Sequence, residues 1–322
     1  YALGKNDYQK DSILPTSIEV SQLAAQLKWT KTLFGTAIKA KGYQSLKKTY
    51  ASTDLNLDVN RLLLKNISAS AKIQYRSQPL NFNYHLFQSD FKEYNWSNTN
   101  LVNQTTFTKS IVVSHPKWGN VSTAWSIINN YGFFNNITRL RDLNEKFKVE
   151  VLQLDKQIHY FKARFNQRLD FGKLSWVNNV QYQKVTQEQD PDQPLGDPLT
   201  LNVPEWLIRS TLMLTSSIFN KALSFQSGAT FVFFTDYYAD QYNPLLSEFV
   251  TQNNTKIGEY PRVDFFFNAK IKSSRIFIKL ENVSAQIEHL IKVDTPYDYY
   301  AAPFTPYRDF SIRFGLIWNF FQ

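Results

Sequence analysis

The chain has 322 residues, of which 43% are hydrophobic and 20% charged, a composition that excludes an intrinsically disordered protein. Its formal net charge of +9 comes from Lys and Arg residues that are scattered, apart from the adjacent Lys47 and Lys48, so no nucleic-acid binding is predicted. The absence of cysteine excludes disulfides, thiol nucleophiles and cysteine-ligated metals. No apolar run approaches the roughly 18–20 residues of a transmembrane helix.

Apolar and polar residues alternate with a period of two along the chain, a pattern that predicts β-strands. Segment 65–76 and the last segment show it most clearly, and no segment combines a 3.6-residue period with helix caps. We therefore predict an all-β fold. The predicted strands cover residues 18–29, 33–42, 53–62, 65–76, 80–90, 105–114, 119–131, 146–155, 158–169, 173–186, 204–218, 221–235, 261–272, 275–283 and 309–321, with residues 1–17 irregular.

The predicted strands and their connections favour an antiparallel up-and-down transmembrane β-barrel. Many strands have 10–15 residues, whereas strands of soluble proteins usually have about 5–6 and a tilted membrane-crossing strand needs about 9–11. Tight turns are predicted at 30–32, 63–64, 220–221 and 273–274, and long connections at 187–203, 236–260 and 284–308. Short periplasmic turns that alternate with long extracellular loops are typical of such barrels.

The predicted strands form a single barrel domain over residues 1–322. Bacterial barrels have an even number of strands, so the fifteen segments indicate either one missing upward strand or one wrong segment. We expect 14–16 strands. With a two-residue turn at 273–274, Ile271 would face Ile276, and with a turn at 220–221, Ile218 would face Leu223, which keeps apolar residues on one face.

Aromatic residues gather beside the long connections. Tyr237, Tyr238, Tyr242 and Tyr260 lie at the ends of one of them, where an interfacial girdle is expected. Tyrosines that cap the core of a soluble sandwich are the alternative interpretation.

The last strand carries a more specific pattern. Its apolar phase is formed by Phe310, Ile312, Phe314, Leu316, Trp318 and Phe320, and it resembles the C-terminal insertion signal of outer-membrane barrels, although Gln322 follows the final Phe. Residues 202–322, with pieces such as "EYPRVDFFFNAKI" and "FTPYRDFSIRFGLIWNFFQ", are similar to the Putative porin family of Bacteroidota outer membranes. The preceding residues show only the barrel pattern. The resemblance implies a multi-pass barrel in the cell outer membrane and, because family members are usually longer, a missing N-terminal part.

Nothing in the sequence predicts catalysis, a cofactor or a metal. The four histidines, at 85, 115, 159 and 289, have no metal-binding spacing, and Gly-x-Ser-x-Gly is absent, so the chain is not predicted to be an enzyme. His85 falls in the polar phase of its predicted strand, which favours a lumen-lining role over a metal ligand. A calcium site in the acidic segment 187–198 is an alternative interpretation, but a solvated loop is favoured because the EF-hand spacing is absent.

The polar phase of the last strands offers the best candidates for function. Charged residues that are predicted to line the lumen there are Arg209, Asp264, Lys270, Lys279, Glu281 and Arg313. They would either set the electric field of an open pore or form a salt-bridged network that plugs it.

The leading functional hypothesis is a porin-like barrel for passive diffusion of small polar solutes. The alternative is a structural or assembly subunit of an outer-membrane protein complex, with a plugged, non-conducting barrel; a soluble β-protein or adhesin ranks third. The partners expected for a barrel are outer-membrane lipid and lipopolysaccharide, the barrel-assembly machinery, and other outer-membrane proteins or lipoproteins.

Overall fold

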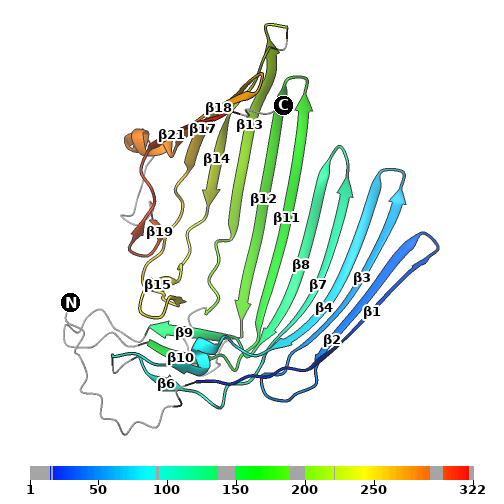
Figure 1. The fold of residues 1–322 in the computed structure, drawn as a ribbon, viewed down its shortest axis with the longest axis vertical. Helices are drawn as coiled ribbons and strands as arrows, with labels where there is room; N and C mark the ends of the chain where they lie inside the picture. The colour runs from blue at the N-terminus through cyan, green and yellow to red at the C-terminus, as the bar shows by residue number, and fades with distance from the viewer. Residues whose placement is uncertain are drawn as a thin grey trace.

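A computed structural model describes residues 15, 17–91, 94–136, 149–188, 200–220, 222–290 and 300–318. Thirteen of its strands form one antiparallel sheet (Figure 1), which confirms the predicted all-β architecture. In sheet order they are β1 (Ala24–Leu33), β2 (Thr36–Ser45), β3 (Thr53–Leu64), β4 (Ile67–Gln78), β7 (Gln104–His115), β8 (Gly119–Asn129), β11 (Ile158–Phe171), β12 (Leu174–Gln187), β13 (Trp206–Ile218), β14 (Leu223–Phe234), β17 (Arg262–Ile271), β18 (Ser274–Glu281) and β21 (Ser311–Trp318).

The other elements belong to the connections between sheet strands. They are α1 (Phe82–His85), the hairpins β5 (Leu86–Phe87) with β6 (Trp96–Ser97), β9 (Gly132–Asn136) with β10 (Val149–Gln153), β15 (Gln241–Asn243) with β16 (Glu248–Val250) and β19 (Tyr300–Ala302) with β20 (Thr305–Pro306), and the 3₁₀-helix η1 (Val283–Leu290). Within the described residues, no helix is long and apolar enough to cross a membrane.

Tight and long connections alternate along the whole sheet, so the predicted asymmetry extends to every hairpin. The turn between β1 and β2 consists of Phe34 and Gly35, both with positive φ, as the twist of a two-residue hairpin requires. All the tight turns lie at one end of the sheet, and the long connections gather at the other, which we call the long-loop end (Figure 1).

Two of the predicted sheet strands are wrong, which reduces fifteen to the observed thirteen. Residues 80–90 form α1 and β5 instead, and the Asn81 side chain caps α1 by accepting a hydrogen bond from the Asn83 N–H at 3.2 Å. Within 146–155, β10 pairs only with β9, outside the sheet. Both segments belong to long connections that fold on one another, so His85 lies in a connection and not on a lumen-facing strand.

The turn positions also needed correction. The first turn lies at 34–35 and not at 30–32, the second at 65–66 and not at 63–64, and Ile271 pairs with Ser274, so that Ala269 faces Ile276. In the β17–β18 hairpin the register slips by two residues, which leaves every side chain of that hairpin on its predicted face because side chains alternate with a period of two. The predicted pairing of Ile218 with Leu223 is confirmed.

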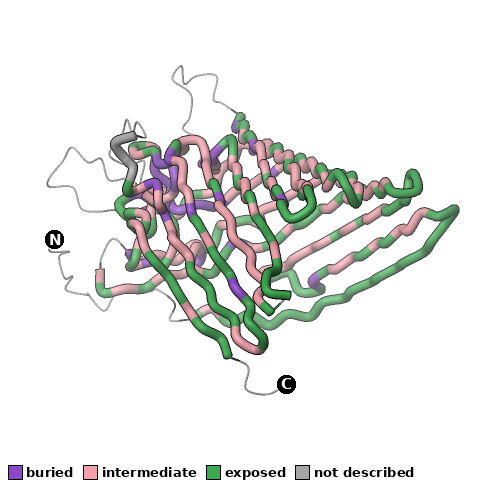
Figure 2. The backbone as a smooth tube through the Cα atoms, turned by 90° about the horizontal axis from the view of Figure 1, so that it is seen from above, coloured by how far each residue is buried: buried purple, intermediate pink, exposed green. Residues whose placement is uncertain are grey.

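The sheet is an open, curved wall (Figure 2) and not a closed ring among the described residues. Its edges are β1 and β21. Because eleven antiparallel strands lie between the two edge strands, β1 and β21 both run from the long-loop end to the tight-turn end.

Candidate functional site

The register assigns each side chain of the wall to one of two faces. Residues that pair directly across strands share a face, so the pairs Lys279 with Arg313 and Lys270 with Arg275 define a polar face. Ile276 pairs with Leu316 on the opposite, apolar face. Four residues of the predicted insertion signal lie on this apolar face in β21, namely Ile312, Phe314, Leu316 and Trp318. Phe310 precedes the strand, and Phe320 lies outside the described residues.

The apolar face is far too extensive to be exposed to water. Phe314 has an exposed fraction of 82% and Leu316 one of 63%, and exposed aromatic and aliphatic side chains continue from β1 to β21. Single soluble domains rarely expose contiguous apolar patches of more than a few hundred Å². Lipid is therefore the solvent that this face fits.

The polar face carries a large excess of positive charge. Fourteen basic side chains lie on it in the sheet strands, against five acidic ones. The basic residues are Lys28, Lys39, Lys41, Lys72, Arg76, Lys162, Arg164, Arg168, Arg209, Arg262, Lys270, Arg275, Lys279 and Arg313, and the acidic residues are Asp54, Asp58, Asp170, Asp264 and Glu281.

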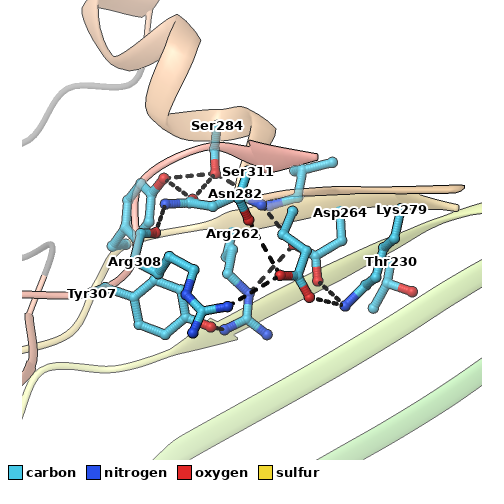
Figure 3. Close-up of polar contacts among 12 residues, drawn as sticks. Thr230, Arg262, Asp264, Lys279, Asn282, Ser284, Tyr307, Arg308 and Ser311 are labelled. Carbon is cyan, nitrogen blue, oxygen red and sulfur yellow. Dashed lines mark hydrogen bonds and ion pairs between the residues drawn. The ribbon is translucent and has the colours of Figure 1, made fainter. Parts of the chain in front are cut away.

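All six charged residues that were singled out from the sequence lie on this face, but only four of them meet. Arg209 lies on β13 and Lys270 at the tight-turn end of β17, and neither has an ion-pair partner within the described part of the chain. Asp264, Lys279, Glu281 and Arg313 come together at the long-loop end of β17, β18 and β21. Figure 3 shows Asp264 beside Lys279.

Glu281 is the centre of this ion-pair network. Its carboxylate lies 2.7 Å from Lys279 Nζ and 2.7 Å from Arg313 Nε, and the Ser311 hydroxyl donates to it at 3.3 Å. Arg308 Nη1 is more distant, at 3.8 Å.

Asp264 lies deeper in the same network. Its carboxylate accepts the backbone N–H of Asn282 at 2.9 Å and lies 3.6 Å from Lys279 Nζ and 3.7 Å from Arg262 Nε. A buried carboxylate needs such partners, because an unpaired buried charge is costly.

A group of hydrogen bonds around Asn282 lies next to this ion-pair network. The Tyr260 hydroxyl donates to Asn282 Oδ1 at 2.5 Å and lies 2.7 Å from Ser284 Oγ, while Asn282 Nδ2 donates to the Arg308 carbonyl at 2.8 Å. Tyr260 is 6% exposed, so the prediction that it belongs to an interfacial girdle is wrong. Asn282 has a positive φ of 53°, at the point where the chain leaves β18.

Sequence reasoning missed Arg262, Tyr307 and Arg308. Arg262 lies two residues before Asp264 on β17, so the alternation of side chains places both on the same face and could have identified Arg262. Its guanidinium lies over the Tyr307 ring, 4.9 Å from the centroid, and also donates to the Tyr307 hydroxyl. Tyr307 and Arg308 lie in the long connection before β21, where no periodic pattern places them.

These residues line a cavity of about 760 Å³, which we call the charged pocket. Its wall is formed by the ends of β17, β18 and β21, and the connection through β19 and β20 contributes the other side. The charged pocket is lined by Arg262, Asp264, Lys279, Glu281, Asn282, Ala301, Pro306, Tyr307, Arg308, Asp309 and Arg313.

A second feature of the long-loop end is a loop cluster, formed by the connections 79–103, 130–157 and 235–261. Its core contains Tyr94, Phe134, Val149, Leu246 and Val250, each at most 5% exposed. Polar contacts join the same connections: Asn83 Nδ2 donates to Glu248 Oε1 at 3.0 Å, and Asn243 Nδ2 donates to the Tyr94 hydroxyl oxygen at 3.1 Å.

No group of three or more acidic or histidine side chains that could hold a metal ion occurs in the described ranges. The acidic segment considered for calcium falls largely on residues 189–199, which lie outside the described residues.

The fold is similar to that of outer-membrane receptors of known structure. A ferric enterobactin receptor of Pseudomonas aeruginosa matches with a TM-score of 0.54 and 14% identity over 81% of this chain and 39% of the receptor. An iron transporter of Neisseria meningitidis matches with a TM-score of 0.54 and 12% identity over 91% of this chain and 44% of the transporter. A siderophore receptor of Acinetobacter baumannii matches with a TM-score of 0.51 and 13% identity over 82% of this chain and 41% of the receptor. The chain thus spans about two fifths of the length of these proteins.

None of the curated proteins compared with the chain matches it. The family of outer-membrane barrels is nevertheless established by a direct match, and fold and family together place the protein in the outer membrane. The model of the family described as "Putative porin" matches residues 3–322, and the protein therefore belongs to that family.

Proposed function

We propose that the described strands form part of the wall of a porin, which allows small polar solutes to diffuse passively across the outer membrane and favours anions. The observation that carries this proposal is the distribution of charge on the wall. Basic side chains outnumber acidic ones by fourteen to five on the polar face, while the other face is apolar. Lipid and lipopolysaccharide would cover the apolar face, and the polar face would line the lumen.

Barrel closure is part of the proposal. Unpaired backbone groups at a sheet edge are too costly to leave in the hydrocarbon region, so β1 and β21 each need a partner there. Since both edge strands run in the same direction, an antiparallel ring needs an odd number of further strands between them. Those strands would come from outside the described residues.

The expected anion preference follows from electrostatics. A low-dielectric wall concentrates the field of its charges in the lumen and raises the local concentration of the opposite ion. Physiological salt screens exposed charges over about 8 Å, so the preference should be weak and should decrease with ionic strength.

The test is the reversal potential of the full-length protein in a planar bilayer under a salt gradient. Arg209, Lys270 and Arg275 are replaced together with Gln, because none of the three has an ion-pair partner among the described residues. Lys279 and Arg313 are left unchanged, since replacing either would remove a partner of Glu281. We expect the reversal potential to shift toward cation preference.

The control removes the same amount of charge elsewhere. Lys65, Lys117 and Lys173 lie in tight turns, away from the polar face, so the triple Gln variant should keep the wild-type selectivity. Equal shifts in both triple variants, or no shift in either, would show that the polar face does not line the ion path.

The loop cluster favours one second candidate, a structural or assembly subunit with a plugged barrel. The cluster is a folded body with its own core at the long-loop end, and the aromatic pair Tyr242 and Phe249 on its β15–β16 hairpin is exposed. A protein that inserts into bilayers but never conducts would support this candidate and refute the porin proposal.

A further inference from the structure

In the charged pocket, as on the polar face as a whole, cationic side chains outnumber carboxylates, and here they line a single cavity. Its wall holds four cationic side chains, Arg262, Lys279, Arg308 and Arg313, around only two carboxylates, Asp264 and Glu281. The pocket's remaining acidic lining residue, Asp309, is exposed.

The two wall carboxylates are already supplied with donors. The Glu281 carboxylate pairs with Lys279 and Arg313 and accepts a hydrogen bond from the Ser311 hydroxyl. The Asp264 carboxylate accepts a hydrogen bond from the Asn282 backbone N–H and lies beside two cations. Neither carboxylate needs a further cation.

The guanidinium groups, in contrast, have donors left over. An arginine offers five N–H donors and no acceptor. Arg308 is 3.8 Å from Glu281, beyond hydrogen-bonding distance, and makes no side-chain hydrogen bond to any other described residue. Arg313 contacts Glu281 through Nε, and the buried Arg262 Nε has no hydrogen-bond partner in the described part of the chain.

The open donors belong to groups of different mobility. Arg262 is held over the Tyr307 ring and lies on a strand, so its position is fixed by the wall (Figure 3). Arg308 and Arg313 have side chains that are 62% and 51% exposed, so they can turn toward a ligand in the cavity. Arginine forks match the paired oxygens of carboxylate and phosphate groups.

We propose that the charged pocket is a binding site for small oxyanions, bound through Arg308 and Arg313, in which a carboxylate or phosphate group takes up the unused guanidinium donors. This inference rests on the proposed porin function, because it names the class of solute that the long-loop end would collect before the solute enters the lumen. The cavity of about 760 Å³ is larger than a single phosphate and has room for a small organic acid.

The test is isothermal titration of the detergent-solubilised protein with sodium succinate and, separately, with sodium phosphate, at constant ionic strength in a chloride background. We expect saturable binding of at least one of the two probes, and the two arms separate carboxylate from phosphate recognition. The absence of saturable binding of both probes up to millimolar concentrations would overturn the proposal.

Variants connect binding to the pocket. Arg308→Gln should weaken binding at least tenfold, and it should fold normally because this exposed side chain makes only one long contact. Arg308→Lys should be intermediate, since an ammonium keeps the charge but loses the planar fork. Lys256→Gln removes an exposed loop charge that is paired with Asp236 outside the pocket, and it should leave binding unchanged.

The outcomes separate this inference from the porin proposal. If Arg308→Gln and Lys256→Gln weakened binding equally, the effect would be general electrostatics and the site would be refuted, whatever the conductance. If the protein bound the probes but never conducted, the porin proposal would fail and the oxyanion site would stand.

Discussion

The wall and the loop cluster place the same kinds of side chain in opposite positions. In the wall, Phe314 and Leu316 are 82% and 63% exposed, whereas in the loop cluster Phe134 and Leu246 are 1% and 2% exposed. The hydrophobic effect favours removal of apolar surface from water in both regions. In the cluster a packed core achieves this, and in the wall we propose that lipid does. Exposure alone therefore does not distinguish a stabilising apolar residue from a liability; the surrounding solvent does.

The largest expected effect is the loss of the cluster core. Phe134→Ala should destabilise the loop cluster by about 3–5 kcal/mol, because it removes a fully buried ring and leaves a cavity. Hydrogen exchange in β9 and β16 should accelerate, while the amides of β11–β13 stay protected. Phe249→Ala is the matched control, since this ring of the same cluster is 56% exposed. Equal acceleration in the two variants would contradict the buried role of Phe134.

The next prediction tests which face of the wall contacts lipid. Leu212 and Met213 are adjacent, near the middle of β13, and face the apolar and polar sides respectively. Leu212→Arg should cost roughly 2–4 kcal/mol of stability in the bilayer, because an arginine on the lipid face lies in hydrocarbon. Met213→Arg should be much milder. Urea titration of folding into lipid vesicles measures both, and the opposite order would reverse the assignment of the two faces.

A smaller effect should depend on pH and be confined to the cluster. Burial raises the pKa of Asp240 to about 6, and the Oδ1 atom of Asp240 has no hydrogen-bond partner among the described residues. Burial, together with the charge of Asp240, also raises the pKa of Tyr131 to about 12. The folded state binds the Asp240 proton more tightly than the unfolded state does. Protonation of Asp240 therefore contributes to the stability of the folded cluster, and this contribution is complete below about pH 4.

The same contribution is lost as the pH rises through 6, and it amounts to about 3 kcal/mol at most. Hydrogen exchange of the cluster, corrected for intrinsic rates, should therefore show less protection at pH 8 than at pH 5. In Asp240→Asn the difference should vanish. A wild-type cluster that became more protected at pH 8 would show that the sign is wrong.

The smallest effect is expected at the surface of the same long-loop region. Lys256 Nζ lies 2.7 Å from Asp236, and this hydrogen bond raises the pKa of Lys256. Both side chains are substantially exposed, so Lys256→Gln should cost less than about 1 kcal/mol. Chemical denaturation would detect a larger loss, which would show that the pair contributes more than an exposed ion pair normally does.

The sequence predicted the wall well because the alternation of side chains is a local property. An error of two residues in the predicted register of the β17–β18 hairpin left Asp264, Lys279, Glu281 and Arg313 on one face, where the structure has them. Segment 80–90 misled because Phe82, Tyr84 and Leu86 alternate with polar residues, as in a strand, although Asn81 caps a helix. The capping residue Asn81 was the feature of the sequence that could have identified this helix.

The remainder of the site could not be predicted from local patterns. Arg308 reaches the network from a long connection, and the contact between Asn83 and Glu248 joins residues 165 positions apart. Such contacts depend on how connections fold over one another, and no short-range period encodes that arrangement.

The loop cluster also has a geometric consequence. Its three connections leave the wall between β4 and β7, between β8 and β11, and between β14 and β17, so they bridge an arc of six strands from β7 to β14. At roughly 4.8 Å between neighbouring strands, that arc has a set length. A rigid body that joins its ends acts as a chord, and a chord and an arc of given lengths together determine a radius. The curvature of the rim is therefore set by how tightly Phe134, Leu246 and their neighbours pack, and not by the strands alone.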